Sequence, residues 1–133
     1  MNEYLYELAQ TSAQIAGSPI RPEWIYCQWA HETGNFTSED SQYHNLGGLC
    51  QTTPNDTPQP DGNEYYMQFA SYEDYADYFG KYLTYYAENG IYSSQTIDDY
   101  ITALKNGGYF GDSLENYLTD CKAILNENFP GVA

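Results

Sequence analysis

Apolar residues recur at intervals of three and four along most of this chain, and that interval places them on one face of an α-helix. In the first segment the apolar stripe runs from Leu5 to Ile15, and Gly17 is a suitable stop. Ser71 and Thr96 are good N-caps, each followed three residues later by an aspartate. The pattern predicts five helices, over about residues 2–16, from Pro22 to a stop at Gly34, and over about 71–88, 96–105 and 113–126.

The stretch between the second and third helices has a different pattern. Residues 49–53 are typical of a short strand, 54–63 hold three prolines and an Asp-Gly pair, and 64–69 resemble a returning strand. Because two short strands are only marginally stable alone, we expect this hairpin lobe, over about residues 48–70, to pack on the helices. The predicted fold is α+β and mainly α: one domain over residues 1–133, with a cleft between the helices and the small β-hairpin lobe.

The composition limits the range of partners. The chain has 133 residues, and 19 acidic against 4 basic residues give a formal net charge of -15. Nucleic-acid backbones and anionic lipid surfaces bind clustered basic residues, so neither nucleic acid nor membrane is an expected partner. No apolar run approaches the roughly 20 residues that span a bilayer. The 16 tyrosines suit clefts that bind polar rings such as sugars, although most are expected to be packing residues.

The cysteines and histidines form no recognisable site. Cys27, Cys50 and Cys121 are an odd number at wide spacing, which argues against a disulfide framework. His31 and His44 do not complete a zinc-site spacing, so we expect no metal and no cofactor. A catalytic pair of Cys50 with either histidine lacks a local signature and is the less favoured chemistry.

Glu32 is the first candidate for chemistry, because it lies in the last turn of the second predicted helix. Ile25, Gln28, Trp29 and Glu32 fall at i, i+3, i+4 and i+7 and share one face. The negative end of the helix dipole and the apolar neighbours both disfavour a charged carboxylate, so we expect a raised pKa. A carboxyl group that stays protonated near neutrality can serve as a general acid. The alternative is a solvated surface glutamate, the usual state near a helix end.

Four sequence elements, in order, resemble the glucosaminidase domain of bacterial peptidoglycan hydrolases, glycoside hydrolase family seventy-three. The pattern Q-x-x-x-E-[ST]-G is matched by Gln28–Gly34, and N-L-[FY]-G by Asn45–Gly48 with glycine in the aromatic position. An aromatic residue, S-[YF] and a D-Y helix are matched by Phe69–Tyr75, and a G-Y-A-x-D-like element by Gly108–Asp112. The resemblance covers about residues 10–127. It implies a lysozyme-like fold and cleavage of the β-1,4 bond after N-acetylglucosamine in peptidoglycan.

The resemblance also implies roles for individual residues. Glu32 corresponds to the catalytic acid, and Tyr109 to a tyrosine near the reacting sugar. A second carboxylate is expected in the hairpin lobe, where Glu64 is the first choice and Asp56 the second, since Asp61 is better explained as a turn residue. If none reaches the cleft, the acetamido group of the substrate can assist instead. Distances decide among the retaining, inverting and assisted routes.

Substrate contacts are expected from residues around this acid, with structural roles as alternatives for two of them. Gln28 either lines the cleft or satisfies a buried backbone group, and Asn45 is also a candidate organiser of its loop. The expected substrate-binding residues are Gln28, Asn45, Asp56, Tyr66 and Phe110.

The expected partner is the glycan strand of peptidoglycan, and the expected state is a monomer. We expect action outside the cytoplasm, in the cell wall or on a phage virion. The N-terminus lacks the charged and apolar regions of a signal peptide, which favours either a virion component or a chain whose signal has been removed. Two other interpretations come from different classes. The short hairpin lobe favours a carbohydrate-binding or structural module without turnover, and the charge alone favours an acidic inhibitor or decoy.

Overall fold

The computed structural model describes residues 1–36, 44–49 and 67–133. Within these residues the chain is mainly helical, with five α-helices, two 3-10 helices and no strand, so the mainly α character and all five predicted helices are confirmed. Of the helices described, none is long and apolar enough to cross a membrane. The elements are α1 (Glu3–Ala16), α2 (Pro22–Glu32), α3 (Tyr72–Leu83), η2 (Thr84–Asn89), η3 (Ile91–Ser93), α4 (Ile97–Asn106) and α5 (Leu114–Asn128).

Side-chain caps determine where four of these helices begin. In each, the N-cap oxygen accepts a hydrogen bond from the backbone N–H three residues later, which satisfies one of the unpaired donors of the first turn. The caps are Asn2, Ser71, Thr96 and Ser113, at 3.1, 3.1, 3.4 and 3.1 Å. α2 begins instead with Pro22, which suits the first position of a helix because it has no N–H to satisfy.

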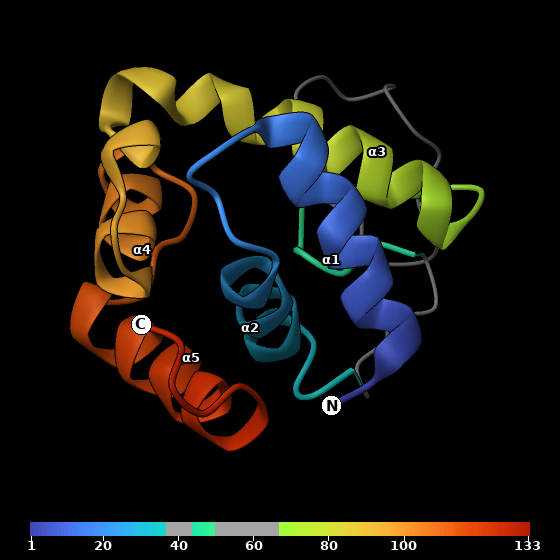
Figure 1. Ribbon diagram of the computed structural model, residues 1–133. Helices are drawn as coiled ribbons and strands as arrows, with labels where there is room; N and C mark the ends of the chain where they lie inside the picture. Colours follow the sequence, from blue (N-terminus) through green and yellow to red (C-terminus); the bar gives the residue numbers. More distant parts are fainter. Residues whose placement is uncertain (37–43, 50–66) are drawn as a thin grey trace.

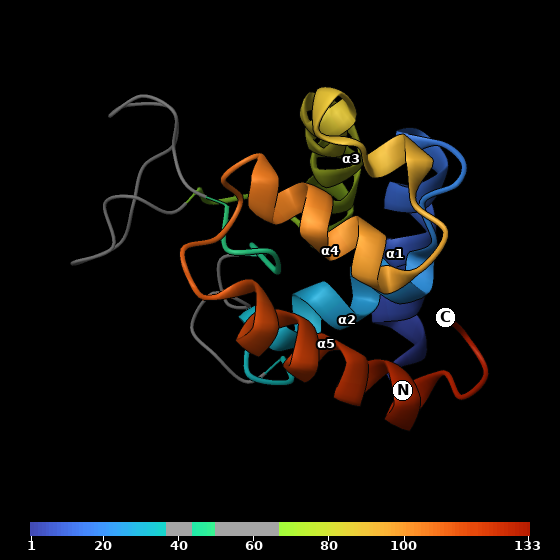
Figure 2. The same ribbon diagram turned by 90° about the vertical axis from the view of Figure 1, so that its left-hand side faces the viewer.

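α2 lies at the centre of the fold, and the other α-helices pack around it (Figures 1 and 2). Residues 23–30 are all buried, so this helix has no solvent-facing side before its last turn. Trp24 packs on Tyr100 of α4, and Trp29 packs on Phe79 of α3. α1 and α5 contact it from the remaining sides. A helix buried all round is fixed by contacts in every direction, and so is the position of its last residue.

The third helix differs from its prediction at its C-terminal end. α3 ends at Leu83, and the chain continues as the 3-10 helix η2 to Asn89, where the pattern predicted one α-helix to about residue 88. The Thr84 hydroxyl donates to the Lys81 carbonyl at 2.6 Å and competes there with α-helical hydrogen bonding. Gly90, with φ 99°, then turns the chain at the predicted stop.

The predicted hairpin lobe lies mostly outside the described residues. Leu49 and residues 67–69 are described and form no regular strand, so the β-hairpin itself stays a prediction. The Met67 N–H donates to the Leu49 carbonyl at 2.8 Å. The Asn45 side chain donates to the carbonyls of Leu49 and Met67 at 2.8 and 2.9 Å. The two described ends of the lobe are therefore held side by side.

α1 and α3 approach each other closely because α3 has a glycine where they meet. A Cβ at Gly80 would lie 2.7 Å from the Ser12 carbonyl oxygen and 2.7 Å from Ile15 Cβ, distances at which something must move. The Ser12 hydroxyl also donates to the Ala76 carbonyl at 2.6 Å, directly between the two helices. Backbone therefore packs on backbone at this interface.

Gly80→Ala should destabilise the protein by roughly 1–3 kcal/mol, because the added methyl group meets the backbone of α1. This cost should outweigh the gain in helix propensity of about 1 kcal/mol. Gly111→Ala is the control, since a Cβ there meets nothing within 4 Å. Urea unfolding followed by circular dichroism measures both variants, and equal midpoints would contradict the packing described above.

Candidate active site

Glu32 is the last residue of α2, and its position follows from how that helix ends. The buried Thr33 hydroxyl donates to a carbonyl one turn earlier and accepts from the Phe36 N–H, both at 2.8 Å. Gly34, Asn35 and Phe36 have φ values of 56°, 64° and 68°. Glycine adopts this left-handed region freely, whereas the two residues with side chains are strained there. The chain therefore turns away directly after Glu32, which lies half-buried at the end of the helix.

A tyrosine from α5 holds the Glu32 carboxylate. The Tyr117 hydroxyl donates to Glu32 Oε1 at 2.8 Å. Tyr117 is only 2% exposed, and the Phe110 ring stacks on it with centroids 3.8 Å apart and an interplanar angle of 10°. His31 contacts the same ring edge-on, at a centroid distance of 4.3 Å. These ring contacts fix the direction in which the phenol donates.

Two further tyrosines meet at the backbone of Gly47. The Tyr109 hydroxyl donates to the Gly47 carbonyl at 2.6 Å. A Cβ at Gly47 would lie 2.4 Å from the Tyr75 hydroxyl oxygen and 2.7 Å from the Tyr109 hydroxyl oxygen. No side chain fits in this space, which accounts for the glycine at the position where the resembled pattern has an aromatic residue.

The charge of Glu32 acts on all three of these phenols. Burial raises the pKa of Tyr75, Tyr109 and Tyr117 well above the usual range, and the negative charge of Glu32 raises each further. The three phenols therefore stay protonated near neutral pH. Burial also lowers the pKa of His31, with Asp120 at 3.6 Å opposing the shift. The surroundings of Glu32 thus contain neutral hydrogen-bond donors.

Lys105 orders the loop that carries Tyr109 and Phe110. Its ammonium group, in the last turn of α4, donates to the carbonyls of Phe110, Gly111 and Asp112 at 3.4, 3.5 and 2.8 Å. It also lies 5.2 Å from the centroid of the Phe110 ring, within cation–π range. One of the four basic residues of the chain is therefore used to hold the loop beside Glu32.

Gln28 and Asn45 both have structural contacts. Gln28 is fully buried, and its Oε1 accepts from the Tyr100 hydroxyl at 2.6 Å, so it satisfies a buried side chain instead of the backbone group considered above. Asn45 is 1% exposed, and its Oδ1 accepts from the Leu49 N–H at 2.9 Å while its Nδ2 donates to Leu49 and Met67. Asn45 therefore organises its loop. A contact of either residue with substrate stays a prediction.

Several of the predicted residues lie outside the described part of the chain, so their positions and the identity of the second carboxylate stay predictions. These residues are Cys50, Asp56, Asp61, Glu64 and Tyr66. Of the described cysteines, Cys27 and Cys121 are buried and free, and burial raises the pKa of Cys27 to about 12. In the described residues no group of three or more His, Cys, Asp or Glu side chains is arranged to hold a metal ion.

The structure brings Glu32, Tyr109 and Phe110 together, and it adds three residues that the sequence motifs do not indicate as site residues. Tyr117 and Tyr75 belong to the apolar stripes of their predicted helices, where a phenol that donates a hydrogen bond looks like any packing aromatic. Lys105 carries a weak signal, because it lies two residues before a Gly-Gly helix stop.

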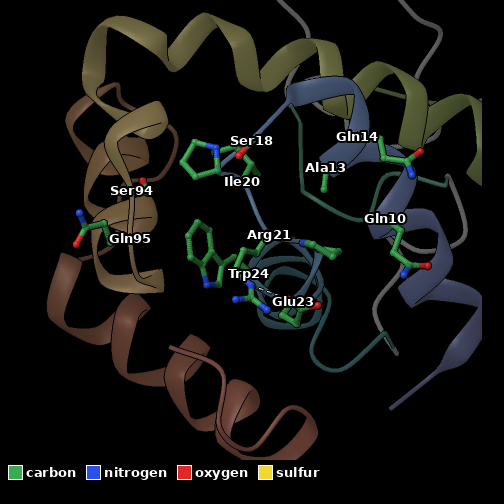
Figure 3. A pocket seen from close by; sticks show the side chains of 12 residues that line it. Gln10, Ala13, Gln14, Ser18, Ile20, Arg21, Glu23, Trp24, Ser94 and Gln95 are labelled. Carbon is green, nitrogen blue, oxygen red and sulfur yellow. Dashed lines mark hydrogen bonds and ion pairs between the residues drawn. The ribbon is translucent and has the colours of Figure 1, made fainter.

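A separate groove of about 740 Å³ lies at the other end of α2 (Figure 3). Gln10 and Gln14 of α1, Arg21 before α2, and Ser94 and Gln95 line it together with their neighbours. None of the predicted site residues borders this groove. At 1.5 Å per residue, the length of α2 separates it from Glu32 by about 15 Å. The groove is therefore no part of the candidate active site.

Gly47→Ala should destabilise the protein, by roughly 1–3 kcal/mol, because the new methyl group meets two hydroxyl oxygens. The destabilisation should be smaller in a Tyr75→Phe, Tyr109→Phe background, in which both oxygens are absent. A double-mutant cycle from urea unfolding measures this coupling. If the changes in the free energy of unfolding from Gly47→Ala and from the two Tyr→Phe substitutions simply add, the two hydroxyl groups do not exclude a side chain at position 47.

Comparison with known proteins identifies the family of this chain. No curated protein and no solved structure matches it. The glucosaminidase family, described as mannosyl-glycoprotein endo-beta-N-acetylglucosaminidase, matches residues 7–129, nearly the whole chain and all four sequence elements given above. This match confirms the resemblance drawn from those elements, and the family supports a glycoside hydrolase. The chain belongs to the glucosaminidase family, glycoside hydrolase family 73.

Proposed function

We propose that this protein hydrolyses peptidoglycan at the β-1,4 bond between N-acetylglucosamine and N-acetylmuramic acid, with Glu32 as the general acid. The observation that carries the proposal is the position of Glu32 at the end of an otherwise buried helix, where the Tyr117 phenol holds its carboxylate. The family match over residues 7–129 supports the reaction class. A carboxyl group held in one orientation is suited to protonate a leaving group.

In the proposed reaction the Glu32 proton passes to the glycosidic oxygen as the bond from that oxygen to the anomeric carbon breaks. The electron pair of the bond stays on the departing oxygen, which becomes a hydroxyl group of the leaving sugar. Water completes the reaction at the anomeric carbon, assisted by a carboxylate of the hairpin lobe or by the acetamido group of the substrate. Tyr109, held by its hydrogen bond to Gly47, is proposed to lie beside the reacting sugar.

The substrate places the proposed action outside the cytoplasm, on the glycan strands of the wall, and a monomer suffices for it. An acidic protein meets electrostatic repulsion there, because the carboxylates and phosphates of a bacterial wall are also negative. With a net charge of -15, this repulsion comes from the whole protein and not from any single residue.

Hydrolysis of intact walls should therefore become faster as salt is raised to about 0.15 M, where the Debye length falls to about 8 Å. Short, uncharged glycan fragments should show little of this dependence. Release of reducing ends from both substrates, measured across a salt series, checks the expectation. A rate on intact walls that falls over the same range would contradict it.

Glu32→Gln should reduce hydrolysis by about 10²-fold or more, because it removes the proton donor and keeps a side chain that can still accept from Tyr117. Glu88→Gln is the matched control at an exposed position. Mass spectrometry of fragments released from purified peptidoglycan identifies the bond, and thermal melting should be nearly unchanged in both variants.

Each outcome of this experiment is informative. Fragments that end in reducing N-acetylglucosamine, from the wild type and Glu88→Gln only, are the expected result. Fragments that end in reducing N-acetylmuramic acid would overturn the proposed bond. Full activity in Glu32→Gln would show that Glu32 is not the general acid. Cleavage of a high-mannose glycoprotein but not of peptidoglycan would change the substrate, and wall binding without cleavage would favour a carbohydrate-binding module.

A further inference from the structure

The contact between α5 and the end of α2 has a role in orienting the acid. We propose that Tyr117 is a positioning residue for Glu32: its phenol holds Oε1 as a hydrogen-bond acceptor, so that the acidic proton is carried by Oε2. The inference rests on the proposed function in one respect, that Glu32 is the acid of the reaction. The hydrogen bond itself can be tested without substrate.

The geometry of the hydrogen bond supports this role. Its length of 2.8 Å is normal for a hydroxyl that donates to a carboxyl oxygen. A phenol has one hydrogen to donate, and the neutral state of Tyr117 keeps that hydrogen in place. Since Oε1 accepts it, a proton that binds the carboxyl group is favoured on Oε2. The acid then donates from one defined oxygen.

The surroundings of Tyr117 keep its ring from turning. Phe110 covers one face at 3.8 Å, and His31 contacts the ring edge-on at 4.3 Å. Lys105 in turn holds the Phe110 backbone and lies near the Phe110 ring. A series of contacts therefore runs from the end of α4 through the loop to the carboxyl group. Phe110, first expected to bind substrate, has its stacking partner within the protein.

The hydrogen bond also affects the ionisation of Glu32. Titratable groups whose pKa the Glu32 charge raises come from three elements: Tyr75 of α3, Tyr109 of the loop, and Tyr117 and Cys121 of α5. On α2 itself the neighbouring group is His31, which faces Asp112 and Asp120. Tyr117 donates directly to the carboxylate, and a donor to the charged form favours that form. The hydrogen bond from Tyr117 thus favours the charged form of Glu32, whereas the negative end of the α2 dipole disfavours it.

The first test is a carbon-13 NMR titration of the Glu32 carboxyl group in the folded protein, in wild type, Tyr117→Phe and Tyr92→Phe. Tyr117→Phe should raise the pKa of Glu32 by about one unit, because the charged form loses its donor. Tyr92→Phe loses a similar partly buried hydrogen bond, to the Ala16 carbonyl, and should leave the pKa of Glu32 unchanged. A pKa of Glu32 that does not rise in Tyr117→Phe would overturn the proposal.

The second test is the pH profile of kcat on peptidoglycan fragments. At the alkaline side of this profile, activity falls as Glu32 loses its proton. In Tyr117→Phe this fall in activity should move to higher pH by as much as the pKa of Glu32 rises. On the low-pH plateau kcat should fall several-fold with KM nearly unchanged, since orientation is lost and binding is not. A lower plateau without this shift to higher pH would show a merely structural role for Tyr117.

A further measurement covers the case in which Tyr117→Phe does not fold. In the wild type, the phenol carbon of labelled Tyr117 should shift with the ionisation of Glu32, and this response should vanish in Glu32→Gln. A phenol carbon that ignores the ionisation of Glu32 would overturn the proposal. The two proposals can fail separately. If NMR confirms the hydrogen bond but neither the wild type nor any variant cleaves peptidoglycan, the proposed function is wrong while the contact between Tyr117 and Glu32 is correct.

Discussion

The burial of α2 on every side is the constraint on which the rest of this structure depends. Trp24, Trp29 and their neighbours require apolar partners all round, and α1, α3, α4 and α5 provide them. A helix held in this way cannot shift along its axis without disturbing several interfaces at once. Both ends of α2 are therefore fixed points. One end borders a groove, and the other places Glu32 among tyrosines that three different segments contribute.

Those tyrosines explain part of the aromatic content of the chain. Tyr109 and Tyr117 are amphipathic, so each packs its ring on the core and directs its hydroxyl group at the backbone or carboxylate near the site. The hydroxyl group of the buried Tyr75 lies at Gly47. Lys105, the basic residue that holds the loop beside Glu32, donates to loop carbonyls. The site thus relies on neutral donors, which suit a carboxyl group that exchanges a proton in the proposed reaction.

Much of the helical architecture could be predicted from the sequence, because each helix carries its own stripe and most carry a cap that acts within four residues. Ser71 and Thr96 illustrate this. The change from α to 3-10 at Thr84 could not be predicted, since it follows from one side chain that competes with the backbone. Glu32 and Tyr109 were accessible through their motifs. Tyr117 was not, because its partner is 85 residues away and its position on an apolar stripe looks like ordinary packing.

The absence of a side chain at Gly47 has a consequence for how this protein can evolve. The two hydroxyl groups that fill the space belong to Tyr75 and Tyr109, far away in the sequence. A change at any one of these three positions alters the volume available to the other two. An aromatic residue at position 47 therefore requires that the tyrosines change as well, so substitutions at the three positions depend on one another.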